Sequence, residues 1–487
     1  MGLAAGLGSL AAQQGSDQPE PHPPAPATPA AQSEPAVQEP GEGAQLRTGT
    51  ASGLDIDTRL ENLLADHEYL RIQAQLGQLP PDLAEIYRGV LANRSNNLNR
   101  SVQLLEPLVD QATASGNAAR EKLVRMTLAE DYLRLGDWAK AGEAYQALDK
   151  RLHDKLSQDE HDEIEMPLKM LPLAKENPPT TVDACEPFRL QVSNDPLGLI
   201  DVPVFIDAAS HSWMLDPTAP FNLISRSIAR EVGLGISEQS ATIRTLTGRP
   251  IQVHVTVIPR FTIGGRLTLH NVTAFVFDDA DYYFPHSSYQ VEGVLGYPAL
   301  AAMGRLTVSD NAIQIDPTKE IDAQMDKDRL NRGAHFYLDG DQIIVAMGRA
   351  AGAGGGSAAT DSPDGASEAG SASGSDDRMF AIDAGGQQTY LTSRWFDEHA
   401  AEFNHQKMQM FSLPGPDSAP VPAYTATTVP LKIGGAKIDL HYIPVLTQPL
   451  GSAARDDVYG VIGIDALDQF ESYTFDYRTM RFSARGQ

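Results

Sequence analysis

The sequence predicts a mainly β protein with two similar lobes, preceded by an α-helical, repeat-like domain. The first observation is a segment that occurs twice, from Trp213-Met214-Leu215-Asp216 to Gly293-Val294-Leu295-Gly296 and from Phe380-Ala381-Ile382-Asp383 to Gly460-Val461-Ile462-Gly463. In both copies 77 residues separate the aspartate from the first glycine. The second observation is a change of pattern. Apolar residues recur at spacings of three and four before residue 157, and at a period of two beyond Pro179.

The two copies also agree between their ends. Each carries Ile-Gly-Gly at a similar place, Ile263-Gly264-Gly265 and Ile433-Gly434-Gly435. Each follows its aspartate with an apolar-hydroxyl-arginine run, Leu223-Ile224-Ser225-Arg226 and Leu391-Thr392-Ser393-Arg394. Two similar lobes that each offer one carboxylate are what a two-aspartate active site requires.

Residues 1–54 are predicted to be a leader remnant followed by a tether. The stretch from Met1 to Ala12 resembles the back half of a secretory signal peptide, which predicts a periplasmic or secreted protein. The alternative is that this alanine-rich start belongs to the low-complexity stretch that follows. That stretch, Gln13 to about Gly53, is rich in Pro, Ala, Gln and Glu and predicts disorder. No run of 18 apolar residues occurs, so no transmembrane segment is expected.

Residues 55–157 are predicted to form the helical domain. In the run from Leu128 to Tyr145, Gly136 ends one helix and small residues allow the next helix to pack closely. This pattern resembles a tetratricopeptide repeat, with a weaker copy near Leu83 to Leu108. A helical bundle of no particular family remains the alternative. Either form offers a packed surface for a protein partner or for the neighbouring lobe.

The two β lobes are predicted at 185–318 and 332–487. Strand-forming residues alternate in Gln252–Val257 and Ala274–Phe277, and turn signals are frequent. Within the second lobe, residues 349–377 form a Gly/Ala/Ser/Asp tract that has too few large apolar residues to form a core. We expect this tract to be a disordered insert.

Composition excludes several classes of function. The net charge of −26 and the absence of a basic stripe argue against nucleic-acid binding, because phosphates would meet an acidic field. A single cysteine, Cys185, excludes an intramolecular disulfide framework and a cysteine-cluster metal site. The twelve histidines show no ligand spacing such as His-Glu-x-x-His. Neither a metal nor a cofactor is therefore expected.

The order of these signals resembles the retropepsin and pepsin group of aspartic peptidases over about residues 185 to 485. The shared order is an apolar strand, an aspartate, a small-residue turn, a hydroxyl residue, a short helix ending in Gly233-Leu234, and then two apolar residues with glycine. The resemblance implies that Asp216 and Asp383 are the catalytic residues. It also implies that Thr247 and Gly248, near the tip of a hairpin predicted at Thr242–Ile258, cover a polypeptide substrate.

Both loops depart from the family's Asp-Thr/Ser-Gly-Ala pattern. The chain has Asp216-Pro217-Thr218-Ala219 in lobe one and Asp383-Ala384-Gly385-Gly386 in lobe two. The family threonine that cross-links the two loops is thus replaced by Pro217 and Ala384. Thr218 keeps an amide N–H that can hydrogen-bond the Asp216 carboxylate.

Three functions follow from this pattern. The leading hypothesis is an aspartic-type endopeptidase that cleaves extended polypeptides. The alternatives are a catalytically silent peptide-binding module on the same fold and a helical-repeat scaffold. A further alternative is that Asp216 and Asp383 only cap their turns. Asp207 is a competing first aspartate, but it lies nine residues too far from Gly233-Leu234, so we place it in the hairpin turn before the strand that leads to Asp216.

Overall fold

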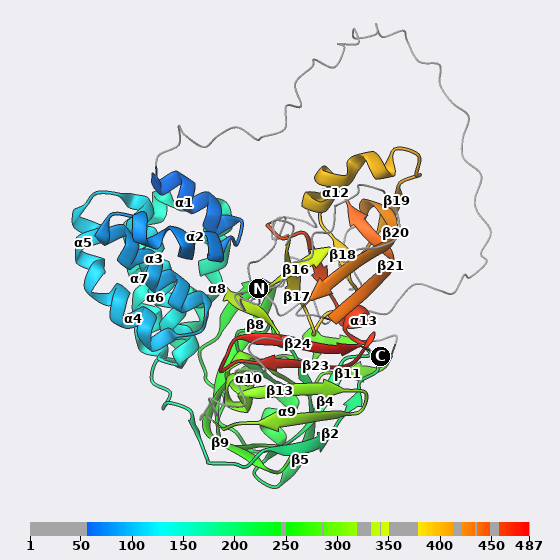
Figure 1. Ribbon diagram of the computed structural model, residues 1–487. Coiled ribbons are helices and arrows are strands. Elements are labelled where there is room, and N and C mark those ends of the chain that lie inside the picture. The colour runs from blue at the N-terminus through cyan, green and yellow to red at the C-terminus, as the bar shows by residue number, and fades with distance from the viewer. Residues whose placement is uncertain are drawn as a thin grey trace, which may run out of the picture.

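The computed structural model describes residues 56–244, 250–284, 287–318, 333–340, 342–349, 378–412, 420–433, 436–448 and 457–486. Figure 1 shows a helical part beside two β lobes. The expected leader and tether lie outside the described residues, as do Thr247, Gly248 and the predicted insert apart from Arg349. No helix in the described part is long and apolar enough to cross a membrane.

The N-terminal part is helical, and its described helices run from Ile56 to Ala174. Gly136 ends the helix before it in a left-handed conformation, with φ of 72°, and the Asp137 side chain caps the next helix by accepting from the Lys140 N–H at 3.1 Å. The last helix contains two prolines, Pro167 and Pro172, and lies wholly beyond the predicted domain boundary at residue 157. The helices are α1 (Ile56–Ala65), α2 (Tyr69–Gln75), α3 (Pro81–Arg94), α4 (Leu98–Leu105), α5 (Val109–Ala114), α6 (Ala118–Leu135), α7 (Trp138–Leu152) and α8 (Gln158–Ala174).

Lobe one is built on a sheet in which nine described strands take part. Long antiparallel pairing between β8 and β9 supports the shorter strands that carry the aspartate loop. A three-residue turn, Gly264-Gly265-Arg266, joins β8 to β9, and both of its glycines have positive φ. The elements are β1 (Thr181–Val182), β3 (Ser193–Asn194), β4 (Ile200–Ile206), β5 (Ala209–Leu215), β6 (Asn222–Ser225), α9 (Arg226–Glu231), β7 (Ala241–Arg244), β8 (Pro250–Ile263), β9 (Leu267–Phe277), β12 (Gly293–Leu295) and α10 (Tyr297–Met303), with a small hairpin of β10 (Tyr283–Phe284) and β11 (Tyr289–Gln290).

Lobe two repeats this order of elements. The long hairpin of β20 and β21 corresponds to β8 and β9, and a short helix again follows the strand after the aspartate. The helix α12 begins after Thr392, just as α9 begins after Ser225. The elements are β16 (Gln342–Arg349), β17 (Arg378–Ile382), β18 (Tyr390–Leu391), α12 (Ser393–His399), β19 (Gln409–Phe411), β20 (Val421–Ile433), β21 (Ala436–Leu446), β22 (Gly460–Ile462) and α13 (Ile464–Leu467).

Six strands join the lobes in one sheet. Their order is β2 (Phe188–Gln191), β14 (Ala312–Asp316), β13 (Arg305–Ser309), β23 (Phe470–Asp476), β24 (Arg481–Gly486) and β15 (Ala334–Asp339). The central pair is antiparallel, with Thr307 opposite Thr474 and their hydroxyl oxygens 2.9 Å apart. Each lobe contributes one strand to this pair and the same succession of strands on either side, which defines a pseudo-two-fold relation. The predicted two-lobe architecture is confirmed.

The helical part packs against both lobes. Its apolar core is continuous with that of lobe one, where Trp138 lies 6.2 Å, ring centre to ring centre, from Phe221. The helix α8 also contacts β7 and β8. On lobe two, Tyr69 packs on Tyr337 with ring centres 4.4 Å apart. The helical part is therefore anchored beside both aspartate loops.

Candidate active site

Each aspartate is held at the end of a buried strand. In lobe one, β5 runs parallel to β12, and the Asp216 N–H donates to the Leu295 carbonyl at 3.1 Å. In lobe two, β17 runs parallel to β22, and the Asp383 N–H donates to the Ile462 carbonyl at 2.9 Å. The matched spacing in the sequence thus corresponds to a matched crossing of strands, as predicted.

A second pair of equivalent hydrogen bonds joins the segment after each aspartate to the glycine at the end of the same repeat. The Gly296 N–H donates to Asn222 Oδ1 at 3.1 Å, and the Gly463 N–H donates to Thr389 Oγ1 at 2.9 Å. A Cβ on Gly296 would collide with the carbonyl of Phe221. The repeated glycines are therefore required because the backbone of the aspartate loop passes directly over them. Sequence reasoning did not identify Asn222 and Thr389, although they occupy equivalent places.

The two carboxylates are both buried and both lie next to Gly385. Asp216 is 2% exposed and Asp383 is 8% exposed. The Gly385 N–H donates to Asp383 Oδ1 at 3.1 Å, while a Cβ on Gly385 would lie only 2.7 Å from Asp216 Oδ1. The backbone at Gly385 therefore lies against both carboxylates. The structure brings the two predicted catalytic residues together.

Thr218 replaces the family glycine of lobe one and binds its own aspartate. Its N–H donates to Asp216 Oδ1 at 2.9 Å, as predicted, and is equivalent to the Gly385 N–H in lobe two. Its hydroxyl donates to the same oxygen at 2.6 Å, which the sequence did not predict. Both bonds stabilise the ionised form of Asp216 relative to the protonated form. The two loops are thus similar in backbone, and lobe one adds a hydroxyl at the position that Gly385 occupies in lobe two.

Asp207 lies where the sequence placed it. It occupies the turn between β4 and β5 with a positive φ of 52°, a conformation that aspartate tolerates better than most residues. This turn is at the opposite end of β5 from Asp216. Asp207 is therefore a turn residue and takes no part in the pair.

A buried tyrosine near Asp216 was missed by sequence reasoning. Burial raises the pKa of Tyr477, and the negative charge of Asp216 raises it further. The Tyr477 ring lies 6.3 Å, centre to centre, from Tyr297, the residue after Gly296. Tyr477 is therefore a neutral phenol beneath the aspartate loop. Its signal was its place after the closing strand, in Tyr473-Thr474-Phe475-Asp476-Tyr477.

The arms of the predicted covering hairpin are present. Strand β7 pairs with β8 from Ala241 opposite Val253 to Arg244 opposite Pro250. Thr247 and Gly248, which the sequence assigns to its tip, lie outside the described residues. Lobe two has an equivalent pair in β19 and β20.

One group of described side chains has the composition of a metal site. Asp149, His153 and His161 place one ligand atom each within 4.8 Å of one another. His153 Nδ1 lies 2.8 Å from Asp149 Oδ1, a partner at i, i+4 on α7, and His161 is on α8. Imidazole and carboxylate ligands suit zinc and similar ions. The group belongs to the helical part and includes neither Asp216 nor Asp383.

Comparison with known proteins finds one family match and similar solved structures. A sequence model of the aspartyl protease family matches residues 202–299. Among solved structures, the chain is similar to a retropepsin-like aspartic protease from Rickettsia conorii, with 12% identity, 27% of this chain and 94% of that chain covered, and a TM-score of 0.20. It is also similar to Basic 7S globulin from soybean, with 10% identity, coverage of 62% and 95%, and a TM-score of 0.36. No curated protein sequence matches the chain.

Residues 202–299 therefore match the aspartyl protease family over lobe one. The matched residues run from β4 to α10 and include Asp216 and Gly296. The elements from β17 to α13 repeat the same arrangement around Asp383.

Proposed function

We propose that the protein is an aspartic-type endopeptidase in which Asp216 and Asp383 form the catalytic pair. The observation that carries the proposal is the contact of the two loops. Gly385 lies against the Asp216 carboxylate, while its N–H binds the Asp383 carboxylate. Two carboxylates held this close cannot both ionise easily, so they share a proton.

The shared proton gives the two carboxyl groups different roles. The ionised member accepts a proton from a water molecule, which attacks the carbonyl carbon of the peptide bond. The protonated member polarises the carbonyl oxygen by donating a hydrogen bond to it. A proton is then returned to the leaving amine as the C–N bond breaks. The Thr218 hydroxyl and N–H both favour the ionised form of Asp216.

The substrate is an extended polypeptide bound as a β-strand. The hairpin of β7 and β8 projects from lobe one, and that of β19 and β20 from lobe two. Such edges can pair with the main chain of a peptide and leave its alternate side chains to contact residues on either side of the bound strand. Main-chain pairing of this kind does not depend on the carboxylates.

A catalytically silent peptide-binding module is the second candidate. Two observations favour it. Thr218 stands where the family has glycine, and both carboxylates are more than nine-tenths buried beside an anchored helical part. The test is hydrolysis of a denatured protein by the intact chain between acidic and neutral pH. Cleavage that stops in Asp383→Asn supports the peptidase, whereas peptide binding without cleavage at any pH identifies the silent module.

The Thr218 hydroxyl should set the acid side of the pH–rate profile. Thr218→Val keeps the shape and the N–H of Thr218 but removes the hydroxyl that donates to Asp216 Oδ1. The ionised form of Asp216 is then less stable, so we expect the acid limb of kcat/KM to move to higher pH by about one unit, the equivalent of one hydrogen bond to a charged group. Thr218→Ser, which keeps the hydroxyl, should retain the original profile. An unchanged acid limb in Thr218→Val would show that the hydroxyl does not act on the working pair.

A further inference from the structure

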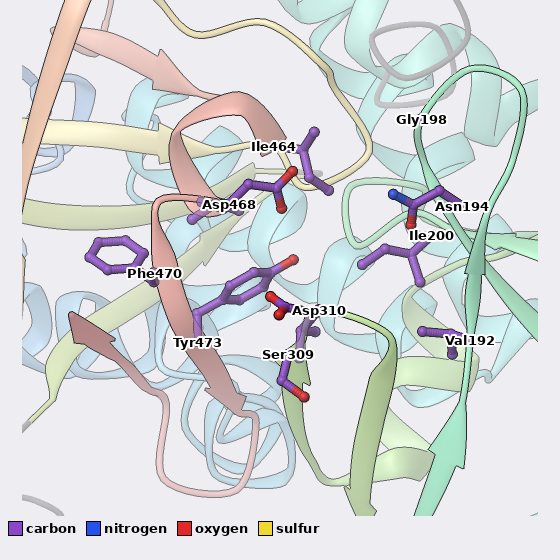
Figure 2. A pocket seen from close by; sticks show the side chains of 12 residues that line it. Val192, Asn194, Gly198, Ile200, Ser309, Asp310, Ile464, Asp468, Phe470 and Tyr473 are labelled. Atoms are coloured by element: carbon purple, nitrogen blue, oxygen red, sulfur yellow. The ribbon is translucent and has the colours of Figure 1, made fainter. Parts of the chain in front are cut away.

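A second acidic site lies at the end of the sheet that joins the lobes. A cavity of about 230 Å³ opens where the turn between β13 and β14, the entry to β4 and the segment after α13 meet (Figure 2). Asp310 comes from the turn, Asp468 follows α13, and Asn194 belongs to β3. Neither Asp216 nor Asp383 lines it.

The two carboxylates at this cavity have no cationic partner among the described residues. Asp310 and Asp468 take part in none of the ion pairs of the described chain, and the described lining contains no lysine or arginine. Burial raises the pKa of Asp468, and the negative charges of Asp465 and Asp310 raise it further. The cavity is therefore a point of uncompensated negative charge.

A buried hydroxyl group is aimed into the same cavity. Tyr473 is only 4% exposed, and its hydroxyl is buried without a hydrogen-bond partner in the described part of the chain. Figure 2 shows the Tyr473 ring directed between Asp468 and Asp310. A buried hydroxyl that lacks a partner costs free energy, and a ligand inside the cavity would remove that cost.

The rest of the wall combines the polar Asn194 and Ser309 with apolar side chains, and it adjoins the Asp383 loop. Ile200, Val308 and Leu467 line the cavity below its acidic mouth. Ile464, also in the wall, donates its N–H to the carbonyl of Gly386 at 2.8 Å. A ligand in this cavity would therefore lie next to Ile464, which is hydrogen-bonded to the loop that carries Asp383.

We propose that this cavity binds an alkylammonium group, with the short aliphatic stem against the apolar side chains of the wall and the charged nitrogen between Asp310, Asp468 and the Tyr473 hydroxyl. An ammonium group donates three hydrogen bonds and accepts none, which matches two carboxylates and a hydroxyl oxygen. The cavity is far larger than a metal ion and has room for a butyl chain. The group could be supplied by a lysine of a bound polypeptide or by a free alkylamine. The polypeptide source rests on the peptide binding proposed above.

The test measures binding and not cleavage, so it stands apart from the proposed catalysis. Labelled extended peptides that differ only by lysine or norleucine are titrated by fluorescence anisotropy into the full chain carrying Asp216→Asn, and n-butylammonium is titrated by calorimetry. We expect the best lysine peptide to bind about tenfold more tightly than its norleucine partner, the scale of charge-assisted hydrogen bonds. Asp310→Asn with Asp468→Asn should abolish that preference. Asp397→Asn with Asp439→Asn, which removes two exposed charges elsewhere on lobe two, should keep it.

The outcomes separate the sources of the amine. A lysine preference that depends on Asp310 and Asp468 identifies the polypeptide. Binding of n-butylammonium without a lysine preference identifies a free amine. Tyr473→Phe should weaken either ligand severalfold while leaving the melting temperature at least as high, because the hydroxyl has no protein partner to lose. The proposal is overturned if neither ligand binds, or if binding persists without both carboxylates.

Discussion

Asp216→Asn and Asp383→Asn should each lower peptide hydrolysis at least about a hundredfold, the scale of a general acid–base residue. Asparagine keeps the size of the side chain but can neither share nor transfer the proton. Because the pair acts as a unit, the double variant should be little slower than either single variant. Single-turnover cleavage of a denatured protein, followed by gel or mass spectrometry, measures these rates.

Asp207→Asn is a matched control for these variants. Asp207 is also an aspartate next to β5, but it lies in the turn at the other end of that strand. Its replacement should leave the rate within about twofold, since turn residues that asparagine can replace contribute little to stability. Peptide affinity should survive in all three variants because main-chain hydrogen bonds do not use the carboxylates. Full activity in Asp383→Asn would contradict the two-aspartate mechanism.

The repeated parts of the fold were predictable because backbone geometry constrains them. An aspartate at a strand end and a glycine beneath its loop must recur at fixed places if two strands are to cross. At Gly296 any side chain would collide with the backbone above it. The two-lobe architecture could therefore be predicted from the 77-residue spacing in both copies. The N–H of Thr218 was predictable for the same reason, since every non-proline residue at that place offers one.

Side-chain partners were harder to predict because they depend on rotamers and on distant parts of the chain. The Thr218 hydroxyl reaches Asp216 only through its particular rotamer. Tyr477 packs near Tyr297 of lobe one because the shared sheet pairs a strand from the chain's end with β13. The docking of the helical part joins residues about 270 positions apart, such as Tyr69 and Asp339. The local spacing of apolar residues does not predict contacts between residues so far apart in the sequence.

Asp339 is the residue on which the docking of the helical part onto lobe two depends most. It lies at the end of β15, where Arg94 Nη2 approaches Oδ1 at 2.8 Å and His67 Nδ1 approaches Oδ2 at 3.1 Å. The Tyr69 hydroxyl donates to Oδ2 at 2.7 Å. The second nitrogen of His67 lies 3.1 Å from Asp457 Oδ2. Arg94 and His67 are 8% and 3% exposed, so their charges depend on this carboxylate.

Asp339→Asn should lower the free energy of unfolding by about 2–3 kcal/mol. This is somewhat less than the loss of a fully buried ion-pair partner would cost, because Asp339 is partly exposed and Arg94 keeps its ion pair with Glu130. Urea unfolding followed by tryptophan fluorescence measures the change. Asp66→Asn is the control, since it breaks the pair with Arg394 across the same junction, where Asp66 is 50% exposed. That exposed pair should contribute less than about 1 kcal/mol. Equal effects of the two substitutions would show that the buried cluster is not what holds the parts together.

The same cluster should make the free energy of unfolding depend on pH, with a maximum at intermediate pH. Burial opposes the charge of His67, but hydrogen bonds to Asp339 and Asp457 outweigh it and raise its pKa from 6.5 to about 9. Its contribution is therefore fully present below pH 6.5 and is lost as the pH rises toward 9. Burial alone would raise the pKa of Asp339, yet Arg94 and His67 hold it well below its ordinary value of 3.8. That contribution is present above pH 3.8 and is lost on stronger acidification.

We expect maximal stability between these limits, and a flatter profile of unfolding free energy against pH in Asp339→Asn, because this one substitution removes a partner from both titrations. A profile that Asp339→Asn leaves unchanged would assign the pH dependence to other groups.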